Sequence, residues 1–124
     1  MNSECEEIKK LFNELSEQPK QSFPKYHQPM DSSTKHGVYI IRNEESVLHV
    51  GRSLRGRNGI RQRLTDHLHD SSSFTKAYLK GRGATLRKDG YTYQYLVLEN
   101  PRRRALLEAY ATGTMCPKHI GLGV

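Results

Sequence analysis

The stretch VLHVGRSLRGRNGIRQRLTDHL, residues 47–68, joins two kinds of secondary structure through a run of positive charge. It begins with a short apolar and β-branched run, typical of a strand, that reaches His49 and Gly51. Its second half repeats aliphatic residues at helical spacing. Five arginines follow Gly51 before the first acidic residue, Asp66. Because a merely solvated surface mixes its charges, this pattern indicates a strand that delivers side chains to a site for an anionic ligand.

The neighbouring sequence predicts a small α/β domain around this stretch. Two β-branched and aromatic runs separated by NEE indicate a hairpin, and apolar spacing indicates helices and a later strand. Pro101 is placed to begin the last helix, and Gly113 to end it. We expect a hairpin at residues 36–51, helices at 60–69 and 74–81, a basic loop at 81–90, a strand at 91–99 and a last helix at 101–113.

An additional helix is expected ahead of this domain, at residues 4–17. Ser3 and Glu6 have the spacing of a capping box, and apolar residues recur on one face of the segment. Residues 18–34 contain three prolines and read as a linker or an extended wrap. The predicted division is therefore an N-terminal helix with its proline-containing linker, 1–34, and a domain at 35–124. The expected fold is a three-stranded mixed or antiparallel sheet flanked by helices.

Composition indicates a single basic domain with a polyanionic partner. The chain has 124 residues, a net charge of +7 and a pI near 9.6. Residues 1–17 hold five Glu and two Lys, net −3, whereas the rest holds 18 Lys and Arg against eight Asp and Glu, net +10. Nucleic acid is the first candidate partner and an acidic membrane surface the second. A basic protein that is simply soluble remains an alternative.

Cysteine usage and hydropathy indicate an intracellular protein. Cys5 and Cys116 lie far apart and outside any metal-ligand spacing, so reduced thiols are expected. The sequence has no apolar run of membrane-spanning length and no charged-then-apolar leader. We therefore expect a cytoplasmic protein without a membrane partner.

Two tripeptides and a set of polar residues in fixed order carry a family resemblance. GVY at 37–39 precedes HVG at 49–51, a helix follows with Arg63 and His67 one turn apart, and Glu108 lies nine residues before Pro117. Over residues 36–120 this order resembles the GIY-YIG nuclease superfamily. The resemblance implies a Mg²⁺-dependent endonuclease, with Mn²⁺ as a substitute, that hydrolyses phosphodiester bonds, in DNA rather than RNA. Two positions depart from the family pattern: His49 replaces a tyrosine, and Ile120 stands where an asparagine often follows the final proline.

The resemblance also implies roles for individual residues. Glu108 would bind the metal, Arg63 the phosphate, and His67 would support the site. Tyr39 and His49 are near-equal candidates for the general base: a phenol with a pKa near 10 needs nearby cations, whereas an imidazole titrates near neutral pH. Gly37 and Gly51 are expected to serve the backbone geometry.

The remaining basic residues are interpreted as a nucleic-acid-binding surface, because phosphate contacts need charge rather than base recognition. The predicted set is Arg52, Arg55, Arg57, Arg61, Lys76, Lys80, Arg82, Arg87 and Lys88. Arg102–Arg104 are better explained as solvated charge, although a helix N-terminus disfavours cations.

Two other functions stay open at this point. The chain could be a non-catalytic nucleic-acid-binding module on a degenerate GIY-YIG fold, which the histidine and isoleucine departures favour. Alternatively, the acidic helix at 4–17 could be an arm that docks a protein partner. The sequence leaves open whether the protein is a monomer or a dimer.

Overall fold

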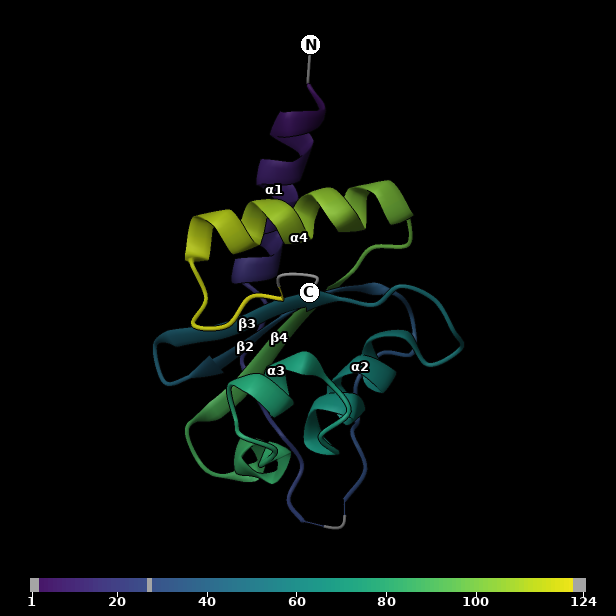
Figure 1. The fold of residues 1–124 in the computed structure, drawn as a ribbon. Helices are drawn as coiled ribbons and strands as arrows, with labels where there is room; N and C mark the ends of the chain where they lie inside the picture. The colour runs from purple at the N-terminus through teal and green to yellow at the C-terminus, as the bar shows by residue number, and fades with distance from the viewer. Residues whose placement is uncertain (1–2, 27, 122–124) are drawn as a thin grey trace.

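A four-stranded antiparallel sheet with helices on both faces forms the protein (Figure 1). The computed structural model describes residues 3–26 and 28–121. In chain order the elements are α1 (Glu4–Ser16), β1 (Gln21–Ser22), β2 (Gly37–Asn43), β3 (Ser46–Arg52), α2 (Gly59–Leu68), α3 (Ser73–Ala77), the 3₁₀ helix η1 (Gly83–Arg87), β4 (Tyr91–Val97) and α4 (Pro101–Met115). Helices α1 and α4 lie on one face, and α2 and α3 on the other (Figure 1).

The sheet has the strand order β1-β4-β2-β3, so the predicted hairpin of β2 and β3 forms one side of it. Its turn places Glu44 at a φ of 53°, and the register sets Tyr39 opposite Gly51 and Ile41 opposite His49. The expectation of three strands is wrong, because the two-residue strand β1 pairs with β4. Two residues in a proline-containing segment are too short to show a strand period.

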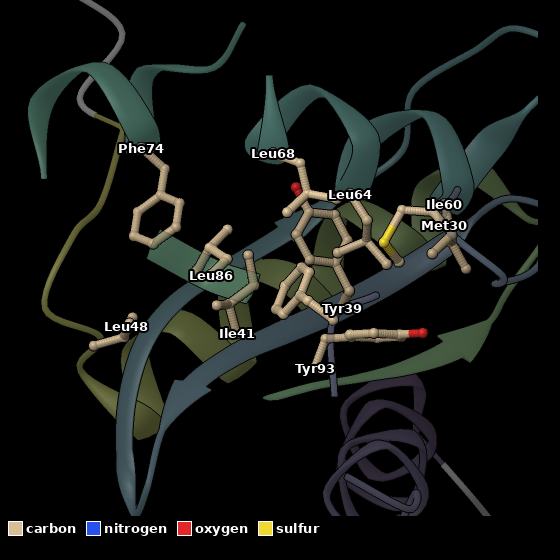
Figure 2. Close-up of a cluster of buried hydrophobic side chains, with 11 residues drawn as sticks. Met30, Tyr39, Ile41, Leu48, Ile60, Leu64, Leu68, Phe74, Leu86 and Tyr93 are labelled. Atoms are coloured by element: carbon tan, nitrogen blue, oxygen red, sulfur yellow. The ribbon is translucent and has the colours of Figure 1, made fainter. Parts of the chain in front are cut away.

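Alternate residues of β2 enter two separate cores, since successive side chains of a strand point to opposite faces. Val38 and Ile40 share a core with apolar side chains of α1 and α4. Tyr39 and Ile41 pack against side chains of α2 and α3, among them Phe74 (Figure 2). All five side chains are fully buried. We name the first side the helix-pair face and the second the pocket face.

Helix α1 is part of this packing rather than a detached arm. The Ser3 hydroxyl accepts a hydrogen bond from the Glu6 amide at 3.1 Å, as the predicted cap requires. Arg102 makes two hydrogen bonds, each 2.9 Å long, with the Glu4 carboxylate. Arg103 and Glu7 form a second ion pair. The acidic first turn of α1 thus offsets Arg102 and Arg103 at the N-terminus of α4, whereas Arg104 is buried, so the interpretation as solvated charge is wrong for Arg104.

Helix boundaries differ from the prediction in two places. Helix α4 passes through Gly113 to Met115 and ends at Cys116, which takes the left-handed conformation with a φ of 48°. The helix expected at 74–81 ends at Ala77. The expected loop at 81–90 contains η1, whose Leu86 is buried in the core of the pocket face.

The proline-containing segment at 18–34 also belongs to the domain. Phe23 and Met30 are buried in the same core as Tyr39. Arg87 holds the segment through hydrogen bonds to the carbonyls of residues 24, 25 and 28, and Arg61 through one to Ser32. No helix within residues 3–26 and 28–121 combines the length and apolar character needed to cross a membrane.

Candidate functional site

A cavity of about 420 Å³ opens beside β3, one of the two edge strands of the sheet. Side chains from β2, β3, α2, α4 and the loop after β3 meet there. They are Tyr39, His49, Gly51, Arg52, Leu54, Arg55, Arg63 and Glu108. Four of the five predicted catalytic residues therefore line one cavity, although up to 69 positions separate them in the chain. The fifth, His67, lies behind Tyr39.

Gly51 makes room for the Tyr39 phenol. A methyl group at Gly51 would overlap the hydroxyl and the ring of Tyr39, which lies directly across the hairpin. Gly37 has a similar constraint, because a side chain there would meet the backbone carbonyl of Leu96. Both glycines are therefore structural, but through the space they leave rather than through the backbone turn expected of them, and Gly51 acts on the candidate site itself.

A buried chain of hydrogen bonds starts at the Tyr39 hydroxyl. Tyr39 Oη lies 2.7 Å from His67 Nε2, and His67 Nδ1 lies 2.7 Å from Ser72 Oγ. Ser72 Oγ is 3.0 Å from Thr75 Oγ1 and accepts from the Thr75 amide. We call Tyr39, His67, Ser72 and Thr75 the polar chain. Sequence reasoning identified its first two members but missed Ser72 and Thr75, which lie at the start of α3.

The direction of these hydrogen bonds follows from the Thr75 hydroxyl. It donates to the Ser72 carbonyl, so within the hydroxyl pair Ser72 Oγ donates to Thr75 Oγ1. Ser72 Oγ then accepts from His67 Nδ1, which leaves Nε2 of the neutral imidazole to accept the Tyr39 proton. Every polar atom of the chain has a partner in this arrangement.

Burial dominates the electrostatics of Tyr39 and His67. Burial raises the pKa of Tyr39 above its ordinary value of 10, and the charge of Arg63 opposes this only in part. Burial, followed by the neighbouring His49 and Arg63, lowers the pKa of His67 well below 6.5. The cations expected to make Tyr39 a base at neutral pH are therefore insufficient by themselves. At neutral pH the pair is a neutral phenol beside a neutral imidazole.

His49 lies between an aromatic ring and a second histidine. Its ring stacks on Phe74 with 4.8 Å between centroids, and its Nδ1 is 3.3 Å from Nδ1 of His119. Burial, followed by the charge of His119, lowers the pKa of His49 to about 4. The sequence argument that His49 titrates near neutral pH is thus wrong, because it took the imidazole as solvated. His49 is a neutral imidazole throughout the neutral range.

His119 was not among the residues predicted from the sequence. The segment after α4 runs along β3, where the amides of Lys118 and His119 donate to the carbonyls of Val47 and Leu48. These bonds place the His119 ring beside His49 and Phe74. Its neighbour Ile120, at the expected asparagine position, is exposed.

Glu108 provides a carboxylate at the cavity, and Arg52 binds it. Arg52 Nη1 donates to Glu108 Oε1 at 2.7 Å, and both side chains are partly buried. Burial raises the pKa of Glu108, while the charge of Arg52 opposes this shift. Within the described residues, no three His, Cys, Asp or Glu side chains form a ligand cluster. The donor set suits Mg²⁺, which often binds one carboxylate and keeps most of its waters.

The residues predicted to bind nucleic acid fall into three groups, according to what their side chains contact. Arg52 and Arg55 line the cavity. Arg61 and Arg87 donate to carbonyls of the 24–32 segment, so their side chains have a structural use that the sequence interpretation did not anticipate. The others are exposed and form no ion pair within the described part of the chain: Arg57, Lys76, Lys80, Arg82 and Lys88.

Comparisons with models of known protein families, with curated proteins and with solved structures find no match for this chain. The interpretation of the site therefore depends on its geometry and on the sequence resemblance.

Proposed function

We propose that the protein is a Mg²⁺-dependent endonuclease of the GIY-YIG type that hydrolyses phosphodiester bonds, in DNA rather than RNA. One observation supports this most strongly: Tyr39, His49, Arg63 and Glu108 line a single cavity, with His67 in contact behind them. Arg55, which forms no ion pair within the described residues, lines the same cavity, as do Arg52 and Arg63, which pair with Glu108 and Asp66. A pocket that combines cations, a carboxylate and two proton acceptors suits attack on a phosphodiester.

The polar chain gives a route for the proton of the attacking water. As the attacking water becomes hydroxide, it gives a proton to Tyr39 Oη, while the Tyr39 proton moves to His67 Nε2 over the 2.7 Å hydrogen bond. Tyr39 is neutral before and after this transfer, so its raised pKa is no obstacle. His67 becomes an imidazolium, against the lowered pKa that burial gives it, and its Nδ1 proton remains on the ring, hydrogen-bonded to Ser72 Oγ. Arg63 supplies positive charge to the phosphate oxygens.

Glu108 is the residue that would bind the metal. A bound Mg²⁺ would neutralise charge on the phosphate and stabilise the leaving oxygen. Arg52 holds one of the two carboxylate oxygens, Oε1, so a cation at Glu108 would bind Oε2 or displace Arg52. A displaced guanidinium would then be available to the substrate's phosphate.

Cleavage of supercoiled plasmid tests this proposal. Wild-type protein with Mg²⁺ is expected to convert supercoiled DNA to nicked or linear forms. EDTA, or the nearly isosteric Glu108→Gln variant, is expected to abolish the conversion. Glu99→Gln, at an exposed carboxylate outside the cavity, is the matched control and should cleave normally. Equal cleavage by wild type and Glu108→Gln would contradict the role of Glu108.

The second candidate is a nucleic-acid-binding module without catalysis, and the Arg52–Glu108 ion pair favours it. A carboxylate already neutralised at 2.7 Å is less available to a metal. In that case wild type binds DNA with strong salt dependence but does not cut it. Releasing the carboxylate with Arg52→Gln separates the candidates: it should change metal-dependent cleavage in an enzyme, and only weaken binding in a module.

A further inference from the structure

The loop between β3 and α2, residues 53–58, presents an apolar side chain at the rim of the cavity. Leu54 is 62% exposed and lines the cavity beside Arg52 and Arg55. Single exposed leucines are common on protein surfaces and need no explanation by themselves. Here, however, the surrounding loop holds the leucine in a fixed position at the rim of the cavity, and this placement does need an explanation.

The backbone of this loop is bound at three points. The hydroxyl of buried Ser53 accepts from the Gly37 amide at 3.0 Å and lies 2.9 Å from His36 Nδ1. His36 Nε2 lies 3.1 Å from the carbonyl of Gly56. Because a carbonyl only accepts, the proton is on Nε2 and the Ser53 hydroxyl donates to Nδ1. The third point is buried Arg104, whose Nη2 donates to the carbonyl of Leu54 at 3.4 Å.

The side chains of the same loop are free to meet a ligand. Arg55 and Arg57 are exposed, and neither forms an ion pair with any residue that the structure describes. The loop therefore holds one apolar group between cations, on a fixed backbone, next to Tyr39 and Glu108. This pattern complements a nucleobase beside its own phosphates, since the base is apolar on its face and the phosphates are anionic.

We propose that Leu54 packs against a base at a break in the stack next to the scissile phosphate. The preferred substrate is then duplex DNA whose stacking is already interrupted, such as a mismatched step, rather than a continuous duplex. Inserting an apolar side chain into an intact stack requires unstacking, which an interrupted duplex has already undergone. This inference depends on the proposed function, because it assumes that the cavity binds a phosphodiester.

Equilibrium binding in EDTA tests the inference without cleavage. Two labelled duplexes of equal length and equal phosphate number are compared, one continuous and one with two adjacent mismatched pairs. Wild type is expected to bind the mismatched duplex about tenfold more tightly. Leu54→Ala should reduce this ratio to within about twofold, with little change for the continuous duplex. Arg55→Gln should weaken both complexes alike and leave the ratio unchanged.

Val97→Ala is the matched control, since Val97 is another exposed apolar side chain, 38% exposed, that does not line the cavity. It should keep the wild-type ratio. Equal affinity of wild type for both duplexes, or an unchanged ratio in Leu54→Ala, would overturn the inference while leaving the nuclease proposal in place. Failure of wild type to bind either duplex would overturn both.

Discussion

The two faces of the sheet are buried to a similar depth but differ in chemistry. Beneath α1 and α4, the helix-pair face packs aliphatic side chains such as Val38 and Ile40, and the nearby ion pairs of Glu4 and Glu7 lie at its exposed end. The pocket face buries the polar chain and His49 among aromatic and aliphatic residues. One side of β2 thus stabilises the fold, and the other accommodates polar groups that are costly to bury.

A buried glutamine on the helix-pair face sharpens this contrast. Gln94 donates to the carbonyls of Ser16, the last residue of α1, and of Gln18, and it accepts from Arg42. These hydrogen bonds join β4 to the end of α1 and to β2, so the buried amide of Gln94 stabilises the fold. The polar chain instead ends at a hydroxyl that lines a cavity. Buried titratable groups at a cavity are typical of functional sites.

Acidification should affect the pocket face most strongly. Burial lowers the pKa of His49 from 6.5 to about 4, so between these values the unfolded state binds more protons than the folded state. Stability is therefore full above pH 6.5 and falls as the pH drops towards 4, by about 3 kcal/mol for this histidine. Burial of His67 acts in the same direction. Urea unfolding at a series of pH values measures the effect.

His49→Phe is the control for that experiment, because a phenyl ring can keep the stack on Phe74 and does not titrate. Its stability should depend less on pH than that of wild type. A wild-type free energy of unfolding that is unchanged between pH 7 and 5 would contradict the burial of neutral histidines.

Crowding at Gly51 should have the next largest effect. Gly51→Ala forces a methyl group into the Tyr39 ring and should reduce the free energy of unfolding by about 1–3 kcal/mol. Gly113→Ala is the matched control: no atom lies within 4 Å of its would-be methyl group, and it belongs to α4. Alanine there should stabilise the helix by up to about 1 kcal/mol. Thermal unfolding of both variants checks the difference, and a tolerated Gly51→Ala would refute the close packing.

The smallest effect is expected at the exposed end of the helix-pair face. The Arg102 side chain lowers the pKa of Glu4, but the pair is exposed and screened by solvent. Glu4→Gln should leave unfolding, DNA binding and cleavage close to wild type, with any change reduced further by salt. A large loss of DNA binding or cleavage would show that the acidic helix has a functional role, as the partner-docking interpretation requires.

Much of the fold was predictable because periodicity and end signals are local. The hairpin, β4, α2 and the Ser3 cap of α1 follow from such patterns. Strand β1 was missed because two residues carry no period. The end of α4 was misplaced because Gly113 is tolerated inside the helix, while Cys116 takes the left-handed conformation that usually favours glycine.

The site was predictable where residue type and order were enough, as for Tyr39 and Glu108. Contacts between distant segments were not predictable, because sequence spacing does not show which side chains meet. The Arg52–Glu108 pair and the His49–His119 pair are examples, each with more than 50 residues between its members. The pKa shifts of the buried side chains were not predictable either, because they depend on burial, which sequence spacing does not show.

The cleavage rate of Tyr39→Phe tests most directly whether the polar chain carries the proton of the attacking water. This change removes one hydroxyl and keeps the ring in the core, so the variant should remain folded at the assay temperature. If the polar chain carries the proton of the attacking water, single-turnover plasmid cleavage should fall by about 10²–10⁴-fold while DNA affinity stays near wild type. A Tyr39→Phe variant that cleaves at the wild-type rate would show that the polar chain serves only the fold, and would contradict the account.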